Sequence, residues 1–257
     1  MMNDYEYFIG EVFKLTQIDL NAYKQNQMKR RIDALIAKHK IEDYATYIET
    51  IKHDHVLFDE FVDYITINVS EFYRNPEQWE FLSKEVIPRL IKEHGDNLKI
   101  WSAACSTGDE PYSLVMELSE FLPLNKIKIF ATDINDQVIE KAKIGLYSEK
   151  SITSVPEKMK AQFFTKNGNF YQISDKVKNC VTFKEHNLLK DLYPKDFHLI
   201  VCRNVLIYFT EEAKDDIFVK FYRSLAEQGV LFIGSTEQII RYKEIGFHRL
   251  ESFFYQK

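Results

Sequence analysis

The stretch Leu98–Tyr112 decides the fold, and it reads Leu-Lys-Ile-Trp-Ser-Ala-Ala-Cys-Ser-Thr-Gly-Asp-Glu-Pro-Tyr. Its first half is apolar and partly β-branched, which predicts a strand buried inside a sheet. Its second half is a run of small residues ending at Gly108, followed by two acids and Pro111, which signal the start of a helix. A strand, a turn of small side chains and a helix N-terminus form the cofactor-binding turn of open α/β folds.

Length and composition are those of a globular protein with one large domain or two smaller ones. The chain has 257 residues, of which 45% are hydrophobic and 28% charged, and only 8 Gly and 6 Pro, which argues against long disordered linkers. No apolar run reaches the ~18 residues needed to cross a bilayer, and the acidic N-terminus does not resemble a signal peptide. The net charge of −5 disfavours a general nucleic-acid binder.

The cysteines and histidines predict neither a disulfide framework nor a metal site. Cys105, Cys180 and Cys202 are far apart in the sequence and form no CxxC pair, so we expect reduced thiols in a cytoplasmic protein. The 7 histidines show no spacing typical of metal ligands.

Residues 1–75 are predicted to form an all-helical N-terminal domain, because their apolar residues recur at helical spacing in four successive segments. The second segment carries a run of basic residues. Taken alone, such a run is more often a solvated helix face than a binding surface. Its members are Lys24, Lys29, Arg30, Arg31, Lys38 and Lys40.

In residues 76–257, helical and strand patterns alternate, which predicts a mainly parallel sheet with helices on both faces. The Lys166–Asn169 segment is a hairpin signal, and it predicts a small antiparallel insert at about 160–185, outside the main sheet. The other predicted elements are helices at 76–94, 109–121, 135–143 and 211–226, strands at 98–103, 127–132, 197–202 and 230–233, and an antiparallel edge at 246–255.

Ligands of such sheets bind beyond the carboxyl ends of the strands, so the residues directly after each strand are the site candidates. They are Ala104 to Glu110, Asp133, Asn187, Leu188, and Arg203 to Tyr208.

The strand ends leave several alternatives open. Asp133 suits either the ribose hydroxyls of an adenosine ligand or the N-cap of the next helix. Glu110 suits either a helix dipole or a cationic amino acid moiety. The turn keeps one glycine of G-x-G-x-x-G, so it does not distinguish S-adenosylmethionine from a dinucleotide. Tyr208 alone is more often a partly buried core residue. An Asn-Pro-Pro-aromatic stretch near Tyr208 would provide carbonyl acceptors for an amino group on a base or amide. No such stretch occurs there, which disfavours N-methylation.

Five motifs in order give the chain a family resemblance. They are Asn68-Val-Ser-Glu-Phe-Tyr-Arg-Asn75, Trp101-Ser-Ala-Ala-Cys-Ser-Thr-Gly-Asp-Glu-Pro-Tyr-Ser113, Asp133-Ile, Asn187-Leu-Leu, and Cys202-Arg-Asn-Val-Leu-Ile-Tyr-Phe209. Together they resemble the chemotaxis-receptor glutamate O-methyltransferases of the CheR type, over nearly the whole chain. Ser70 stands where that family commonly has Thr, and Tyr73 where Phe is usual.

The resemblance implies a Rossmann-like class I methyltransferase domain at 76–257 that transfers the methyl group of S-adenosylmethionine to receptor glutamates. It implies Arg74 and Tyr208 nearest the transferred methyl, and the basic second helix as the docking surface for the helical cytoplasmic domain of a receptor. The implied enzyme is a cytoplasmic monomer without metal, nucleic acid or membrane insertion. The implied cofactor-binding residues are Asn68, Ser70, Arg74, Ala104, Glu110, Asp133, Asn187, Leu188, Arg203 and Asn204.

The chemistry needs little beyond alignment, because a glutamate carboxylate with a pKa of about 4.3 is already ionised near neutral pH. This fits the lack of a His or Cys nucleophile constellation. A methyltransferase for nucleic acid or small molecules, and a non-catalytic S-adenosylmethionine sensor, are the alternatives. Whether the insert binds a receptor C-terminal peptide stays open.

Overall fold

The computed structural model describes residues 4–257, which form two compact units. The smaller unit comprises residues 4–68 together with Tyr208–Lys214, and the larger unit comprises Val69–Ile207 and Asp215–Lys257. The sequence pattern places the boundary at residue 75, whereas the units divide at Asn68.

The smaller unit contains the four helices that the sequence predicts. The aromatic side chains of Phe8, Tyr47 and Phe61 are fully buried at its centre, with ring centroids 6.0–6.3 Å apart. Asp43 and Asp54 cap two of the helices by accepting hydrogen bonds from backbone N–H groups. The helices are α1 (Asp4–Thr16), α2 (Gln25–Lys38), α3 (Tyr44–His53) and α4 (His55–Thr66), with the 3₁₀ turn η1 (Leu20–Ala22).

The segment Tyr208–Lys214 returns to the smaller unit by pairing with the residues after η1. The backbone N–H of Lys24 donates to the Tyr208 carbonyl at 2.8 Å, and the Thr210 N–H donates to the Ala22 carbonyl at 2.8 Å. The rings of Tyr23 and Phe209 lie 4.7 Å apart between these bonds. No local signal in the sequence indicates this pairing.

The larger unit is built on a 7-stranded sheet with the order β6-β2-β1-β7-β8-β10-β9. The first five strands of this order run parallel, and β10 and β9 are antiparallel to their neighbours. The predicted mainly parallel sheet is confirmed. The strands are β1 (Lys99–Ala103), β2 (Lys128–Asp133), β6 (Val181–Glu185), β7 (Phe197–Cys202), β8 (Leu225–Ile233), β9 (His248–Glu251) and β10 (Phe254–Gln256).

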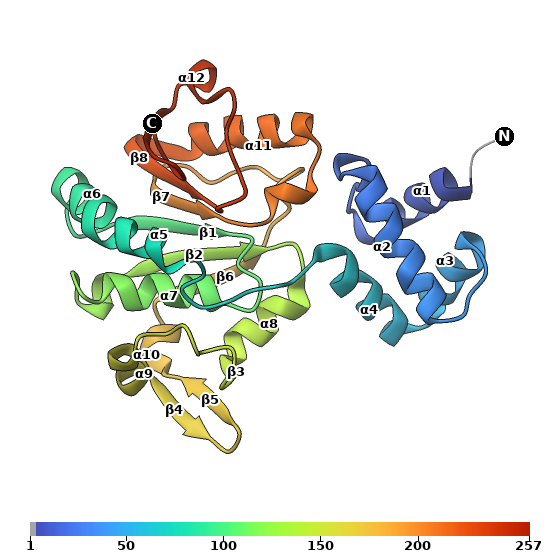
Figure 1. Cartoon of the computed structure of the whole chain (residues 1–257), viewed down its shortest axis with the longest axis horizontal. Helices are drawn as coiled ribbons and strands as arrows, with labels where there is room; N and C mark the ends of the chain where they lie inside the picture. Colours follow the sequence, from blue (N-terminus) through green and yellow to red (C-terminus); the bar gives the residue numbers. More distant parts are fainter. Residues whose placement is uncertain (1–3) are drawn as a thin grey trace. The chain divides into compact units, whose positions relative to one another are not determined.

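Helices cover both faces of the sheet, as Figure 1 shows for α11 on one side and α7 and α8 on the other. Trp101 of β1 packs edge-on against Phe221 of α11, whereas Tyr112 of α7 packs against Phe183 of β6. The helices are α5 (Pro76–Phe81), the π-turn η2 (Leu82–Val86), α6 (Ile87–His94), α7 (Asp109–Leu118), η3 (Leu124–Lys126), α8 (Asp136–Ile144), α9 (Glu157–Phe163), α10 (Asp175–Lys178), η4 (Leu206–Tyr208), α11 (Glu211–Ser224) and α12 (Tyr242–Ile245).

The small antiparallel sheet differs in extent from the predicted insert. It consists of β3 (Leu146–Ser148), β4 (Phe164–Asn167) and β5 (Phe170–Ile173), in the order β3-β5-β4. The predicted hairpin is confirmed, with Asn167 paired to Phe170. The assignment of residues 181–185 to the insert is wrong, because they form β6 and pair in parallel with β2. This strand is polar in sequence because it is an edge strand, and three of its five residues are exposed.

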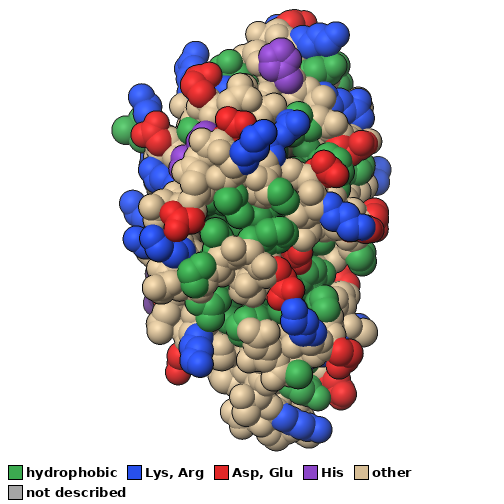
Figure 2. Space-filling view, turned by 90° about the vertical axis from the view of Figure 1, so that its left-hand side faces the viewer, with side chains coloured by type: hydrophobic (Ala, Val, Ile, Leu, Met, Phe, Trp, Pro, Cys, Tyr) green, Lys and Arg blue, Asp and Glu red, His purple; other side chains and the backbone are tan. Residues whose placement is uncertain are grey.

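The face of the molecule drawn in Figure 2, on the α6 side of Figure 1, carries hydrophobic side chains gathered near its centre. Lys and Arg side chains alternate with Asp and Glu around that patch. This face therefore offers no continuous field of one sign to a charged polymer.

Candidate functional site

The backbone of the turn after β1 enters the left-handed region, which is unfavourable for non-glycine residues and persists where neighbouring bonds impose it. Ala104 and Ser106 have positive φ values of 72° and 47°. The N–H groups of Ala104 and Cys105 both donate to the Thr132 carbonyl at 2.8 Å, which ties the turn to the end of β2. The turn ends at Gly108, which precedes α7 with a φ of 89°. A Cβ at Gly108 would lie 2.9 Å from the Cβ of Ala142, so only glycine fits.

Asp133 joins the ends of β1 and β2. Its carboxylate accepts a hydrogen bond from the Ser106 N–H at 2.8 Å and one from the Asn135 N–H at 3.1 Å. Burial raises the pKa of the Asp133 carboxyl, and the backbone N–H groups act against that shift. The N-cap alternative for Asp133 is wrong, because Asn135 caps α8 by accepting from the Gln137 N–H. Contact with a ribose stays a prediction.

Glu110 lies in the first turn of α7, but its side chain points into the protein and is only 12% exposed. The Ser102 hydroxyl donates to one carboxylate oxygen at 2.7 Å, and Arg203 Nη1 lies 4.0 Å from the other. Burial raises the pKa of the Glu110 carboxyl to about 7, while the charges of Arg203 and Arg74 act in the opposite direction. A carboxyl desolvated in this way favours a cationic partner.

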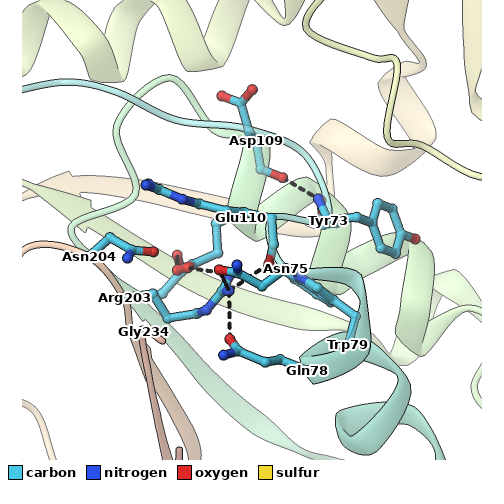
Figure 3. A network of polar contacts seen from close by, with 12 residues as sticks. Tyr73, Asn75, Gln78, Trp79, Asp109, Glu110, Arg203, Asn204 and Gly234 are labelled. Carbon is cyan, nitrogen blue, oxygen red and sulfur yellow. Dashed lines mark hydrogen bonds and ion pairs between the residues drawn. The ribbon is translucent and has the colours of Figure 1, made fainter. Parts of the chain in front are cut away.

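Arg203 reaches from the end of β7 to the start of α5, as Figure 3 shows. Its Nη2 donates to the Arg74 carbonyl at 2.6 Å, to Gln78 Oε1 at 2.9 Å and to Asn75 Oδ1 at 3.3 Å. Its guanidinium also lies over the Phe232 ring, 4.7 Å from the centroid. The side chain of Arg203 therefore orders the segment 67–75 between α4 and α5, which carries Arg74 and is called the junction below.

The backbone of the junction is also hydrogen-bonded to α5 and to α7. The Trp79 indole N–H donates to the Arg74 carbonyl at 3.0 Å, and the Tyr73 N–H donates to the Ser113 hydroxyl at 3.2 Å. Burial raises the pKa of the Asp109 carboxyl, and hydrogen bonds, including one from the Ser70 hydroxyl, act against that shift. The junction backbone is therefore rigid, while the Arg74 side chain is only half-buried.

The remaining strand-end candidates of the larger unit lie on short loops. Asn204 has a positive φ of 59°, and its Oδ1 is buried without a hydrogen-bond partner within residues 4–257. Asn187 closes a turn by accepting from the Leu189 N–H at 2.9 Å. Leu188 is buried, and its carbonyl accepts from the Tyr193 hydroxyl at 2.8 Å.

Two candidates belong to the smaller unit. Asn68 donates to Thr66 Oγ1 at 2.9 Å, which places it at the end of α4. Tyr208 is half-buried, and its backbone is bonded to the residue that precedes α2.

Some of the basic side chains on α2 are already bonded to other residues of the smaller unit. Lys29 bonds Asp33 and Tyr44, and Lys38 bonds Glu60 at 2.5 Å. Arg31 donates to the Tyr64 carbonyl at 2.6 Å and stacks over the ring of that residue. Within residues 4–257, the exposed side chains of Lys24, Arg30 and Lys40 enter no such contact.

Sequence reasoning missed four residues of this site. Gln78 and Trp79 lie on α5, directly after the motif Asn68–Asn75. The only sign that they belong to the site is that Gln78, a polar residue, occupies a buried position of the helix. Lys220 of α11 donates to the Leu189 carbonyl at 2.7 Å and supports the loop after β6. Glu237 follows β8 and would have been found by extending the strand-end search to that strand.

The arrangement fits S-adenosylmethionine. The acceptors near the carboxyl ends of the strands, where its polar groups would bind, are the Glu110 carboxylate, the Asp133 carboxylate and Asn204 Oδ1, which has no hydrogen-bond partner within residues 4–257. Within the described part of the chain no group of three metal-ligating side chains occurs. No helix among residues 4–257 is long and apolar enough to cross a membrane.

Comparison with known proteins agrees with this geometry. Residues 68–252 match the family described as "CheR methyltransferase, SAM binding domain", and residues 3–66 match "CheR methyltransferase, all-alpha domain". The chain is 44% identical to a chemotaxis protein methyltransferase of Listeria monocytogenes, over 99% of this chain and 97% of the relative. It is 32% identical to one of Borreliella burgdorferi, over 86% of this chain and 83% of the relative.

A third relative, chemotaxis protein methyltransferase 1 of Pseudomonas aeruginosa, is 33% identical over 92% of this chain and 90% of its own length. The matched ranges span both units and cover the part of the chain that contains Gly108, Glu110, Asp133 and Arg203. The chain belongs to the CheR methyltransferase family and is an S-adenosylmethionine-dependent methyltransferase.

Proposed function

We propose that the protein methylates the γ-carboxylates of glutamate side chains on the helical cytoplasmic domains of chemotaxis receptors. Family membership supports the methyl transfer, and the absence of a base constellation among the described site residues supports a substrate that is already ionised. The observation that carries the proposal is the cluster of Arg74, Glu110 and Arg203 at the carboxyl edge of the sheet.

S-adenosylmethionine, when bound, supplies an electrophilic methyl group on a positively charged sulfur. With S-adenosylmethionine held at the strand ends, a glutamate oxygen would form the new bond to the methyl carbon as the carbon–sulfur bond breaks, and the electron pair of that bond would stay on sulfur. The products are a neutral glutamate methyl ester and S-adenosylhomocysteine. No proton is transferred, because the glutamate is ionised at neutral pH.

The protein's own residues supply binding and alignment. Glu110 and Asn204 are the acceptors for the cationic amino group of the cofactor, and Asp133 is the acceptor for the ribose. Arg74 holds one oxygen of the substrate carboxylate through a charge-assisted hydrogen bond, so that the other oxygen faces the methyl group. Tyr208 is the second residue we assign next to the transferred methyl. Asn68, Ser70, Ala104, Asn187 and Leu188 are assigned to the cofactor pocket.

Receptor docking is assigned to the exposed cations of α2. Each methylation removes one negative charge from a receptor helix, so the substrate region is acidic before transfer. Lys24 and Arg30 are exposed and suit such a surface, whereas Arg31 stabilises the helical unit itself through Tyr64. The enzyme is proposed to act as a cytoplasmic monomer.

The decisive experiment is methyl transfer from labelled S-adenosylmethionine to a panel of receptor fragments, tRNA, DNA and small molecules. Label should enter only the receptor fragment, and mild alkali should release it as methanol because the product is an ester. Alkali-resistant label, or label in nucleic acid, would contradict the proposal. Arg74→Ala should nearly abolish turnover while the fold is retained.

The docking surface has its own test. Arg30→Glu should raise the KM for the receptor about tenfold and leave the KM for S-adenosylmethionine unchanged, because Arg30 belongs to α2 of the smaller unit, whereas Glu110, Asp133 and Arg203 belong to the larger unit. Lys92→Glu, which makes the same charge change on α6 of the larger unit, is the control. Equal kinetics for the two variants would refute docking through α2.

A further inference from the structure

A buried acid that none of the assignments above uses lies just after β8. Glu237 is 6% exposed, and backbone N–H groups donate the hydrogen bonds that its carboxylate accepts. One oxygen, Oε2, accepts from the Gly234 N–H at 2.7 Å and from the Asn204 N–H at 3.0 Å. The other, Oε1, accepts from the Leu206 N–H at 2.8 Å.

These bonds join two loops that leave neighbouring strands. β7 and β8 run parallel, with Cys202 paired to Ile233, so the loops after them begin side by side at the carboxyl edge of the sheet. The first loop carries Arg203 and Asn204, and the second carries Gly234 and Glu237. The Glu237 carboxylate therefore fixes one strand end to the next at the proposed cofactor site.

The close approach of the two loops leaves little room for alternatives. A Cβ at Gly234 would lie 2.7 Å from the Asn204 nitrogen, so only glycine permits the contact. Asn204 itself has a φ of 59°, a conformation that costs a non-glycine residue free energy and persists only where neighbours impose it. Glu237 supplies that constraint by binding the Asn204 N–H.

A buried carboxylate is a poor choice for stability alone. Desolvation raises the free energy of the ionised form, and apolar residues of similar volume often stabilise a protein as well or better. Within residues 4–257 no cation lies within 4.0 Å of the Glu237 carboxylate, whereas three backbone N–H donors converge on it. Such an anion orients N–H groups, which favours a role in geometry.

We propose that Glu237 is a positioning residue for methyl transfer. It fixes the loop after β7 so that Arg203 reaches the Arg74 carbonyl and Gln78, and so that Asn204 Oδ1 faces the cofactor. The proposal rests on the assignment of Arg203 and Asn204 to the cofactor site. It does not depend on which methyl acceptor the enzyme uses.

The test is Glu237→Gln, which keeps the size of the side chain but replaces one acceptor oxygen by an N–H₂ group. That group cannot accept from a backbone N–H, so at least one of the three bonds is lost. We expect the Kd for S-adenosylhomocysteine, measured by calorimetry, and the KM for S-adenosylmethionine to rise about tenfold to a hundredfold. The KM for the receptor should stay within about twofold of wild type.

Glu227→Gln is the matched control, because Glu227 lies on the same strand with an 85% exposed side chain and distant from the loop after β7. Amide hydrogen exchange adds a readout of geometry: Asn204, Leu206 and Gly234 should exchange faster in Glu237→Gln, and α2 amides should not. Glu237→Asp, which keeps the charge on a shorter arm, should recover part of the cofactor affinity relative to Glu237→Gln.

The proposal is overturned if Glu237→Gln binds S-adenosylhomocysteine as tightly as Glu227→Gln. It is equally overturned if the KM values for cofactor and receptor rise together, as a general loosening of the fold would cause. Should Glu237→Gln fail to fold, Glu237→Asp is measured by the same criteria. Failure of the glutamate assignment would leave these cofactor measurements unaffected.

Discussion

Replacing Glu110 by Gln should raise the free energy of unfolding of the ligand-free protein at neutral and alkaline pH. The same change should weaken cofactor binding. The carboxyl has a pKa of about 7 in the folded chain against 4.5 in its ordinary state, because burial disfavours its ionised form. A group whose pKa is raised by folding stabilises the protein below its unfolded pKa, and that contribution is lost as pH rises through the folded pKa. The amide of the Glu110→Gln variant cannot ionise, so the variant does not lose this stability as the pH rises.

The size of the effect follows from the shift. A difference between about 7 and 4.5 corresponds to about 3 kcal/mol at pH 8 and to less than about 1 kcal/mol at pH 5. The Ser102 hydroxyl can still donate to the amide oxygen of Gln, whereas the attraction to Arg203 at 4.0 Å is lost. We therefore expect a net gain of about 1–3 kcal/mol at pH 8 and almost none at pH 5.

Cofactor affinity should change in the opposite direction. Loss of a charged acceptor for an ammonium group should raise the Kd for S-adenosylhomocysteine about tenfold to a hundredfold. In wild type this affinity should increase from pH 6 to pH 8 as Glu110 ionises, and in the variant it should not. The assays are urea unfolding of the ligand-free protein at both pH values and calorimetric titration.

Two results would refute the reasoning. A variant no more stable than wild type at pH 8 would show that burial does not disfavour the ionised form of the Glu110 carboxyl. An unchanged Kd with the same pH dependence would place the cofactor's amino group elsewhere. Glu227→Gln, on an exposed side chain, is the control for the loss of one negative charge.

Three further predictions test the geometry around the turn. Gly108→Ala should lower the free energy of unfolding by roughly 2–4 kcal/mol in urea, since its Cβ would meet Ala142 at 2.9 Å in a left-handed conformation; a loss under 1 kcal/mol would contradict this. Arg203→Lys should reduce kcat/KM about tenfold to a hundredfold in the methyl-transfer assay, because an ammonium cannot span the acceptors of the guanidinium; unchanged kinetics would remove its ordering role. Lys220→Met should raise the KM for S-adenosylmethionine about threefold to tenfold by freeing the Leu189 carbonyl, and an effect on the receptor KM alone would argue against it.

Much of the fold could be predicted from local signals. The strand Phe197–Cys202 and the four N-terminal helices follow from hydrophobic periodicity, and the hairpin follows from the turn residues at Gly168. Those signals fail where an element depends on distant partners. β6 is polar in sequence, and only its pairing with β2 makes it part of the main sheet.

The sequence by itself determined the four N-terminal helices, the strands β1, β2, β7 and β8, the turn at Gly108 and most of the polar residues at the strand ends, because periodicity, turn residues and spacing are local properties. Tertiary structure decided what those residues do. Burial among residues far away in the sequence raises the pKa of the Glu110 carboxyl to about 7. Arg31 of α2 donates to the Tyr64 carbonyl because α2 packs against α4. Glu237 binds the loop after β7 because parallel strands place residues far apart in sequence at one edge, where a charge excluded from water must find its partners in the chain.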